Sequence, residues 1–471
     1  MATRRTKSDR IEPRVIGAVL ATGLMSLSGV IVETAMNITF PTLMQQFHIT
    51  TGTVQWMTTL YLLIVACIVP ISSYLKRRFP LKRLFITANL LFIAGIVIDG
   101  LAPNFPLLLT GRAIQGFGTG IALPLMFNII LEQVPLSRLG LMTGIGTLVT
   151  AIGPAIGPTY GGILVTALNW RYIFWILVPF LVASFFVGVK TIRQVTPTRP
   201  EPFDWPSMLS IMVTFGGLIY GFSAVSSHAW LSLPVTGSLV LGLVGLAYFS
   251  HRSLHLDTPL IHLQALQNKA FSGHLLAFFL LQIASLGLSF ILPNYLQLVD
   301  QKTAFIAGLM VLPGSAVGAC FAPIGGQILD HFGAKRPILL GLALAVLSLL
   351  GMTLLAQHLS AWLILSLYVI YMVGIGLGFG NLMTSGLQHL TGDLKADGNA
   401  LMNSLQQFSG AVGTALVSAI IAASQAVAGS TTALKTASGS QTALAVLVVT
   451  SAVAWLTMVW SLGQTGTFRK K

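Results

Sequence analysis

Residues 15–40 read VIGAVLATGLMSLSGVIVETAMNITF, and Glu33 is the only charged residue among them. A helix that crosses a bilayer needs about 20 predominantly apolar residues, and this segment exceeds that length. An acid within the hydrocarbon costs at least about 2.5 kcal/mol and usually faces a bundle interior or a cavity. The segment therefore predicts a transmembrane helix that carries a functional carboxylate.

The composition of the whole chain agrees with this first helix. Of its 471 residues 54% are hydrophobic and only 8% are charged, whereas soluble proteins have about 25% charged residues. We therefore expect an all-α integral membrane protein. The net charge of +14 comes from short basic clusters between apolar runs, which does not indicate nucleic-acid binding. The two cysteines form no CxxC pair, and no metal site is predicted.

Fourteen apolar runs are long enough to span a bilayer. They cover residues 15–40, 54–75, 84–102, 107–131, 141–165, 171–189, 205–224, 231–249, 271–296, 304–329, 337–356, 362–387, 399–423 and 441–463. An even number of crossings places both termini on one side. On that side the terminal segments and loops carry 22 of the 26 Lys and Arg residues. The positive-inside rule therefore predicts cytoplasmic termini and a multi-pass protein of the plasma membrane.

An internal repeat indicates two related halves. Residues 70–83 read PISSYLKRRFPLKR, residues 323–336 read PIGGQILDHFGAKR, and five of the fourteen positions are identical. The two copies lie eight spans apart, which fits two six-helix halves with two extra helices between them. Parallel repeats of six helices build one large class of secondary transporter. The predicted division is residues 1–190, the first half; 191–269, the linker with the two extra helices; and 270–471, the second half.

Motifs in several spans resemble those of the fourteen-helix drug:proton antiporters of the major facilitator superfamily, the QacA/EmrB/LmrB-like group. The second span contains QWMTTLYLL, the fourth GRAIQGFGTG, and the fifth GPAIGPTYGG at residues 153–162, which is similar to the family's GPxxGPxxGG. The first span ends ETAMNITFP, similar to the family's DxTIVNVALP. The resemblance covers nearly the whole chain and implies a major facilitator fold with proton-driven drug export.

Two segments depart from the family pattern. Val32 occupies the position of the family's acid in the first span, and Glu33 follows one residue later. One residue is about 100° of rotation around a helix, so the two acids would point in different directions. The loop at 70–83 lacks the family's Gly and Asp residues, whereas the copy at 323–336 keeps them. The resemblance therefore implies a weaker gate in the first half.

Three charged residues are predicted to couple transport to protons: Glu33, Asp99 and Arg112. All three should lie in the outer half of the membrane, where an entering proton would meet them first. A fixed positive charge at Arg112 would help a nearby acid to ionise. Each has an alternative: a static salt bridge to Arg112 for Glu33, an exposed loop position for Asp99, and a purely structural role for Arg112.

The other candidate residues form three groups. Aromatic rings and amides are expected to line a substrate cavity: Asn37, Trp56, Tyr61, Gln115, Phe127, Phe290, Asn294, Tyr295, Gln297, Asn403 and Gln407. Small residues and prolines of the fifth span form a conformational motif: Gly153, Pro154, Gly157, Pro158, Gly161 and Gly162. The resemblance implies an inner gate at Arg77, Arg78, Gly326, Asp330, Gly333, Lys335 and Arg336.

These features predict a proton-coupled exporter of lipophilic, neutral or monocationic drugs that works by alternating access. No nucleotide-binding or hydrolase motif is found, so we expect neither an enzyme nor a cofactor. The expected partners are small lipophilic molecules, protons and the lipid bilayer, and the expected state is a monomer. One alternative keeps the fold but exports or imports a metabolite or lipid. A non-transporting membrane sensor is the other alternative.

Overall fold

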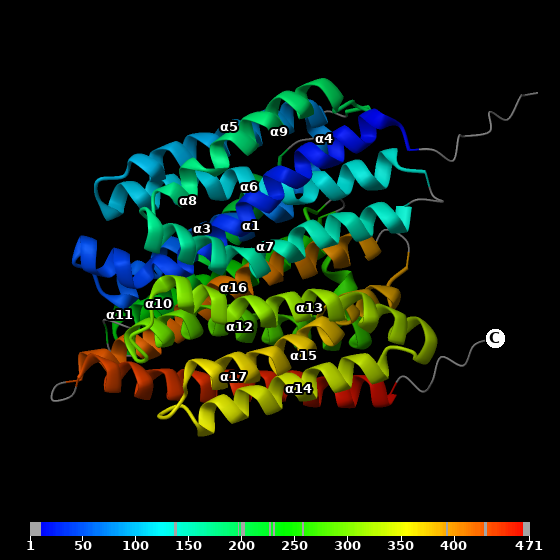
Figure 1. The fold of residues 1–471 in the computed structure, drawn as a ribbon. Coiled ribbons are helices and arrows are strands. Elements are labelled where there is room, and N and C mark those ends of the chain that lie inside the picture. Colours follow the sequence, from blue (N-terminus) through cyan, green and yellow to red (C-terminus); the bar gives the residue numbers. More distant parts are fainter. Residues whose placement is uncertain are drawn as a thin grey trace, which may run out of the picture.

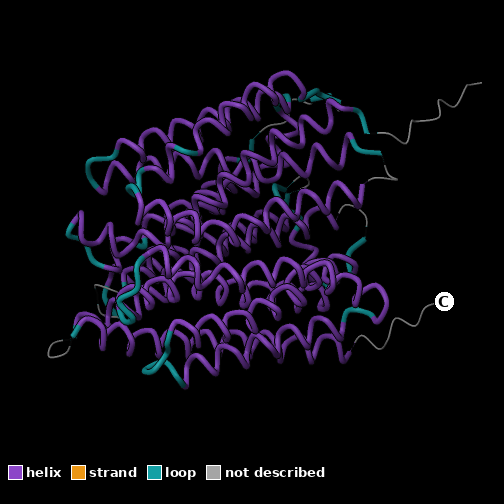
Figure 2. Tube along the Cα trace, in the orientation of Figure 1, coloured by secondary structure: helices purple, strands orange, loops and turns teal. Residues whose placement is uncertain are grey.

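The structure is a computed structural model that describes residues 11–135, 139–195, 197–198, 203–225, 228, 231–256, 259–391, 394–427 and 431–464. Throughout these ranges the regular structure is helical (Figures 1 and 2). The elements are α1 (Pro13–Phe47), α2 (Thr51–Val54), α3 (Trp56–Ile68), η1 (Val69–Ile71), α4 (Ser72–Arg78), α5 (Leu81–Leu101), α6 (Phe105–Gln133), α7 (Leu139–Ala167), α8 (Tyr172–Trp175), α9 (Leu177–Thr191), α10 (Trp205–Ala224), α11 (Leu233–His255), η3 (Leu263–Gln267), α12 (Lys269–Leu298), α13 (Ala304–Phe332), α14 (Lys335–Leu354), α15 (Ala361–Gln388), α16 (Leu394–Ala426) and α17 (Thr432–Gln464).

Each predicted span lies on one of these helices or on a short consecutive series of them. Within the part of the chain that could be searched, 13 helical segments are long and apolar enough to cross a membrane. The fifth predicted span coincides with α7, a further helix of 29 residues. The start of α1 and the end of α17 lie at the same end of the bundle, on the right of Figure 1. We call this the terminal end and the opposite one the far end.

Local sequence signals set the ends of the helices. Side chains of Asn104, Asn268 and Thr303 accept a hydrogen bond from the backbone N–H three residues later and thereby cap α6, α12 and α13. The helix α13 ends at Phe332, and the following residue, Gly333, has a φ of 81°, in the region that favours glycine. Prolines remain inside α1, α6, α12 and α13, as membrane helices tolerate them when neighbouring groups satisfy the freed backbone.

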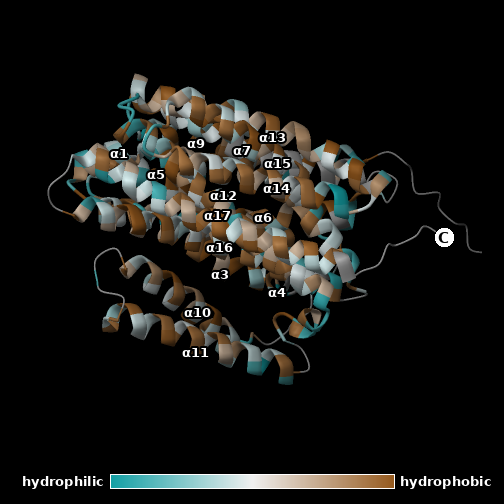
Figure 3. Cartoon of the chain, turned by 90° about the horizontal axis from the view of Figure 1, so that it is seen from below, coloured by the Kyte–Doolittle hydropathy of each residue, from teal (hydrophilic) through white to brown (hydrophobic). Residues whose placement is uncertain are grey.

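The helices form two halves and a separate hairpin. In the first half α1 packs against α6, α7 and α9, and α6 packs against α3 and α5. In the second half α12 packs against α15, α16 and α17, and α13 and α14 both pack against α15. The hairpin α10–α11 lies at the edge of the bundle (Figure 3), where α10 contacts both α3 and α16. The two halves meet where α7 packs on α13, α3 on α16 and α1 on α12.

Hydrogen bonds between the two halves concentrate in the far half of the bundle. Asn37 Nδ2 donates to Ser289 Oγ at 3.2 Å, and Gln297 Nε2 donates to the Ile38 carbonyl at 3.1 Å. Others join Thr51 to Gln425, Thr59 to Thr414, Thr159 to Gly308 and Phe305 to Thr166. Among the described residues, the structure therefore holds the halves together at the far end.

Candidate functional site

Arg112 is the centre of a buried polar network in the first half. Its side chain is fully buried on α6. Nη1 donates to Gln115 Oε1 at 2.7 Å, and Nε donates to the carbonyl of Met57 on α3 at 3.2 Å. The guanidinium carbon lies 4.2 Å from the centroid of the Tyr61 ring, a cation–π distance. An arginine needs such partners to remain charged away from water.

Asp99 joins this network through Gln115. Gln115 Nε2 donates to Asp99 Oδ2 at 2.7 Å, so the amide bridges the acid and Arg112. Asp99 is 0% exposed and lies inside α5. The alternative that Asp99 is an exposed loop acid is therefore wrong. The other oxygen, Oδ1, packs against Gly111, where a Cβ atom would collide with it.

Tyr61 connects the network to α1. Its hydroxyl lies 2.9 Å from Thr119 Oγ1 and 3.4 Å from the carbonyl of Gly29. Gly29 is one turn of α1 before Glu33. The ring of Tyr61 therefore lies between the arginine and the helix that carries the predicted coupling acid.

Glu33 is half-buried on α1 and makes no hydrogen bond or ion pair with a described residue. Arg112 is the positive charge that acts on it electrostatically. Glu33 and Arg112 therefore do not form the static salt bridge that was the alternative to a coupling role for Glu33. Two buried polar atoms of the network, Asp99 Oδ1 and Arg112 Nη2, also have no hydrogen-bond partner among the described residues. Within the described part of the chain, Glu33 therefore has no fixed hydrogen-bond partner, and its role in proton coupling stays a prediction.

The glycines of α7 face two neighbouring helices. A Cβ atom on Gly153 would lie 2.6 Å from Cγ1 of Val30, and one on Gly161 would lie 2.6 Å from the Ala35 carbonyl oxygen. Between them, Gly157 packs against Thr34, the residue after Glu33. This face therefore fits directly against the segment of α1 that carries the acid.

A second face of α7, rotated by about 100° from the first, packs on the second half. A Cβ on Gly162 would lie 2.5 Å from the Ala304 carbonyl oxygen, and Pro158 packs against Gly308 of α13. The side chain of Pro154 is outside the described residues. The small residues thus place α7 in contact with both the segment of α1 that carries Glu33 and helix α13 of the second half.

The predicted cavity residues do not form one cluster. Tyr61 and Gln115 belong to the network described above, and Trp56 lies 6.1 Å from Tyr220 of α10 between ring centroids. Tyr295 donates to the Ala356 carbonyl within the second half at 2.7 Å. Asn294 donates to the Phe290 carbonyl of its own helix at 2.7 Å.

Three of the predicted cavity residues lie at the contact between the halves. Phe290 packs edge-on against Phe40 of α1 at 5.4 Å, and Asn37 and Gln297 make the cross-half hydrogen bonds given above. Phe127, Asn403 and Gln407 are half-buried elsewhere on α6 and α16. The lining of a substrate cavity by these residues stays a prediction.

The predicted gate residues lie at the terminal end. Arg78 is exposed at the end of α4, and Lys335 and Arg336 are exposed in the first turn of α14. Gly326 has open space around it, and Gly333 directly follows α13. The side chains of Arg77 and Asp330 fall outside the described residues.

Comparison with known proteins places this chain in a family. The sequence profile of the Major Facilitator Superfamily matches residues 19–414. The chain is 37% identical to the lincomycin resistance protein LmrB of Bacillus subtilis (strain 168), over 90% of this chain and 88% of that protein. The chain belongs to the Major Facilitator Superfamily. It is a transporter, not an enzyme, and it has the multi-pass helical architecture of that superfamily.

Two further similarities are consistent with this family assignment. A lincomycin resistance protein LmrB of Listeria innocua serovar 6a is 35% identical over 90% of both chains. A solved POT family transporter, in complex with a thioalcohol-conjugated peptide, superposes with a TM-score of 0.72 at 17% identity, over 96% of this chain and 97% of that one. At this identity the second similarity concerns the fold alone.

Several residues of the transporter's network were missed by the sequence analysis. Thr119 binds the Tyr61 hydroxyl, and Gly111 makes room for Asp99. Thr58 donates to Asn37 Oδ1 at 3.2 Å and joins α3 to the contact between the halves. Gly111 directly precedes Arg112 in the motif GRAIQG, so the motif itself contained that signal.

Proposed function

We propose that this transporter is a proton-coupled antiporter that exports lipophilic, neutral or monocationic drugs from the cytoplasm. The observation that carries the proposal is the unpaired carboxylate of Glu33 beside the buried charge of Arg112 and against the small-residue face of α7. A proton on Glu33 changes the charge next to the interface of the two halves. The lincomycin resistance of its relatives supports a drug as the substrate.

The proposed cycle uses Glu33 as the exchange site. With the carrier open to the cytoplasm, the ionised carboxylate favours a cationic or polarised drug. After the carrier opens outward, a proton binds Glu33 and weakens drug binding. The protonated carrier returns and releases the proton inside. Asp99 and Gln115 hold Arg112 in place throughout, and no cofactor is needed because the proton gradient supplies the energy.

Charge balance gives the proposal a quantitative form. Exchange of a monocation for one proton moves no net charge, so the pH gradient alone drives it. Exchange of a neutral drug moves one charge, which adds about 2.3 kcal/mol per 100 mV of membrane potential. The same carrier should thus respond to voltage with a neutral substrate and not with a monocation.

The test is transport in reconstituted vesicles under an imposed pH gradient, with ethidium as the monocation and lincomycin as the drug. We expect the wild type to move both and Glu33→Gln to move neither on the gradient, although the variant still binds them. The matched control is Asp300→Asn, which changes an acid that follows α12 outside the spanning segment, and it should transport normally.

Two results would count against the proposal. Normal gradient-driven transport by Glu33→Gln would show that this acid is structural and would leave Asp99 as the coupling candidate. No transport of any drug by the wild type, in vesicles where the protein is folded, would favour a metabolite or lipid as the substrate. The proposed orientation, with cytoplasmic termini, is tested by protease access to the two termini in the same vesicles.

A further inference from the structure

Asn37 of α1 and Ser289 of α12 join the two halves at matching places in the fold. Asn37 lies four residues before Pro41, which is inside α1. Ser289 lies four residues before Pro293, which is inside α12. A proline has no N–H, so the carbonyl four residues before it loses its helical hydrogen bond and the helix is prone to bend there. The bond from Asn37 Nδ2 to Ser289 Oγ at 3.2 Å therefore connects α1 and α12 at a weak turn of each helix.

The amide of Asn37 is also held within its own half. Thr58 Oγ1 of α3 donates to Asn37 Oδ1 at 3.2 Å, which leaves Nδ2 for Ser289 of the second half. Asn37 is 3% exposed and Thr58 is 1% exposed, so water does not compete for these bonds. We call Asn37, Thr58 and Ser289 the hinge junction. Movement of α12 away from α1 would break the bond of Nδ2 and keep the bond of Oδ1.

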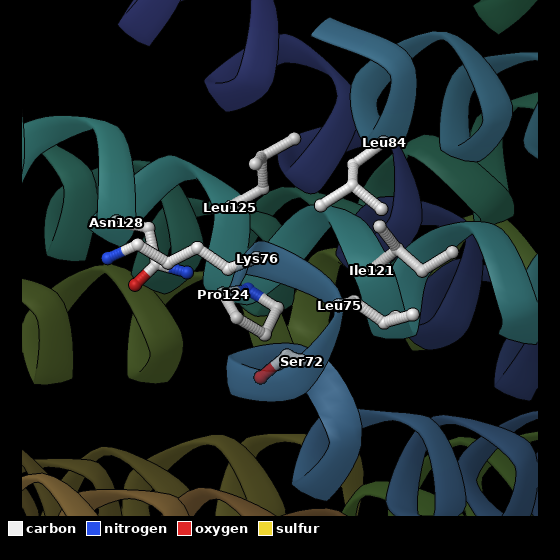
Figure 4. A pocket seen from close by; sticks show the side chains of 8 residues that line it. All are labelled: Ser72, Leu75, Lys76, Leu84, Ile121, Pro124, Leu125 and Asn128. Atoms are coloured by element: carbon white, nitrogen blue, oxygen red, sulfur yellow. The ribbon is translucent and has the colours of Figure 1, made fainter. Parts of the chain in front are cut away.

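Close packing surrounds the hinge junction while the far end is closed. Phe40 lies about one turn after Asn37, and its ring packs edge-on against Phe290, 5.4 Å away between centroids. The small hollow between α4, α5 and α6, lined by Ser72 and Leu125 among others, lies toward the terminal end (Figure 4), and none of its lining residues belongs to the hinge junction. Asn37 can therefore change its partner only when α1 and α12 separate.

Glu33 is an acceptor within reach of Asn37 on the same helix. Residues four apart are neighbours on a helix surface, with Cβ atoms about 5–6 Å apart, and polar side chains at this spacing form hydrogen bonds. Helical side chains lean toward the N-terminal end of their helix, so the Asn37 amide leans toward the turn of Glu33. Glu33 makes no hydrogen bond with a described residue. Its carboxylate has two oxygens, so one can accept from Asn37 while the other faces a drug.

The charge of Glu33 decides how strongly it accepts a hydrogen bond. An ionised carboxylate accepts through both oxygens, and bonds to it are shorter and stronger than bonds between neutral groups. A protonated carboxyl group has one O–H donor and a weaker remaining acceptor. The Asn37 amide should therefore bind ionised Glu33 more tightly than protonated Glu33, whereas the Ser289 hydroxyl offers the same acceptor in both cases.

The charges that act on Glu33 belong to its own half. Arg112 of α6 and Tyr61 of α3 interact with it electrostatically. Of the other helices that contact α1, the described α2, α7 and α8 contain no charged residue and no histidine. Those of α9, α12 and α13 are at or near the terminal end, away from Glu33: Lys190, Lys269, His274, Asp330 and His331. Separation of the halves therefore changes the partner of Asn37 without bringing a new charge to Glu33.

We propose that Asn37 is a positioning residue that links the proton on Glu33 to the contact between the halves, by exchanging Ser289 for the Glu33 carboxylate when the far end opens. Ionised Glu33 satisfies the freed Nδ2 and favours the open far end, whereas protonated Glu33 favours the return of Asn37 to Ser289. In the proposed cycle the ionised carrier opens outward and the protonated carrier returns, so the exchange favours both steps. The inference rests on the proposed role of Glu33 and not on the identity of the drug.

The test measures the distance across the far end in the purified, drug-free transporter. Spin labels at Leu168→Cys and His358→Cys, two exposed far-end positions, are placed in a background with Cys67 and Cys320 replaced by alanine. Pulsed EPR then gives the open fraction from about pH 5 to about pH 9. The ratio of open to closed protein should rise about ten- to hundredfold with pH, the effect of one hydrogen bond to a charged group. Glu33→Gln should lack this pH response.

Variants of the two partners separate their roles. Ser289→Ala removes the bond between the halves and leaves Asn37 beside Glu33, so the open-to-closed ratio should rise about two- to tenfold at every pH, with the pH response retained. Asn37→Ala removes both bonds, so its pH response should fall to that of Glu33→Gln. Asn37→Ala/Ser289→Ala leaves neither partner of the cross-half bond unpaired and should also lack the pH response. This double variant keeps the proposal testable where Asn37→Ala does not fold.

The outcomes distinguish this inference from the proposed function. A full pH response in Asn37→Ala or in the double variant would overturn the role of Asn37 and leave Glu33 as the coupling acid. A wild-type distance that does not change with pH would also overturn it, since the charge of Glu33 would then not control the far end. A pH response that Asn37→Ala abolishes, in a wild type that moves no drug on a pH gradient, would support the inference and contradict the proposed drug export.

Discussion

Gly157 of α7 packs directly against Thr34 of α1, the residue that follows Glu33. Thr34 Oγ1 donates to the Val30 carbonyl at 2.9 Å and lies 3.4 Å from the Gly153 carbonyl. The proposed proton site and the helix that contacts the second half therefore share one tightly packed surface. A shift of α1 on protonation cannot leave α7 in place, because interiors at this packing density transmit displacement.

The first prediction follows from this packing. Gly157→Ala inserts a Cβ into the space of Thr34 and should cost about 1–3 kcal/mol of folding stability through overpacking. We expect gradient-driven dye efflux to fall, because the added methyl group prevents α7 from packing as closely on the segment of α1 that carries Glu33. The measurement is efflux per molecule of protein in vesicles.

Two further variants test whether the collision with Thr34 causes that loss of efflux. Gly216 of α10 has open space where its Cβ would lie, so Gly216→Ala should transport normally. Adding Thr34→Ala removes the colliding hydroxyl and should partly restore Gly157→Ala. Full activity of Gly157→Ala alone would show that the α1–α7 contact has no role in transport.

The second prediction concerns the amide between Asp99 and Arg112. Gln115→Leu keeps the volume but leaves two buried ionisable groups, Asp99 and Arg112, without their shared partner, and each unsatisfied group costs about 1–3 kcal/mol or more. We expect a clear drop in the thermal unfolding temperature of the detergent-purified protein. Gln407→Leu is the control, since this half-buried amide on α16 makes no side-chain hydrogen bond with a described residue. Equal unfolding temperatures in the two variants would contradict the bridging role.

The third prediction separates the two contacts of Tyr61. Tyr61→Phe keeps the ring beneath Arg112 and loses the hydroxyl bond to Thr119, which should cost about 1 kcal/mol. Tyr61→Leu also loses the cation–π contact, a further cost of about 0.5–2 kcal/mol. The free energies of unfolding of the wild type, Tyr61→Phe, Thr119→Val and the double variant form a double-mutant cycle. The cycle measures the energy of the bond between the two hydroxyl groups. If Tyr61→Phe costs as much as Tyr61→Leu, the ring contributes nothing to holding the arginine.

The helices and the family could be predicted from the sequence because their signals are local. Apolar length alone locates the spans, and the motif at 153–162 carries the family resemblance. The same motif predicts a small-residue ridge on α7, since glycines four residues apart share a helix face. What those glycines touch depends on the rotation of α1, and the sequence contains no direct signal for that rotation.

The details of the site required the structure for the same reason. Sixteen residues separate Asp99 from Gln115, and a loop lies between their helices, so their contact depends on how α5 and α6 are rotated. Asn37, Phe290 and Gln297 were predicted as cavity residues from their chemistry, yet here they join the two halves. A polar residue at such an interface can contact the other half in one state of the transporter and substrate in another, and its type alone does not distinguish these roles.

The last prediction tests whether the far end must open during transport. The Phe305 N–H donates to Thr166 Oγ1 at 3.1 Å, across the contact between α7 and α13. Because the Thr166 side chain reaches the Phe305 backbone directly, cysteines at these two positions are candidates for a disulfide. We expect Thr166→Cys/Phe305→Cys, in a background with Cys67 and Cys320 replaced by alanine, to crosslink on mild oxidation and to stop dye efflux. A reductant should restore efflux, because the disulfide only prevents separation of the two helices. Each single cysteine variant should be insensitive to the oxidant. Transport at the full rate by the crosslinked protein would mean that α7 and α13 stay together at the far end throughout the cycle.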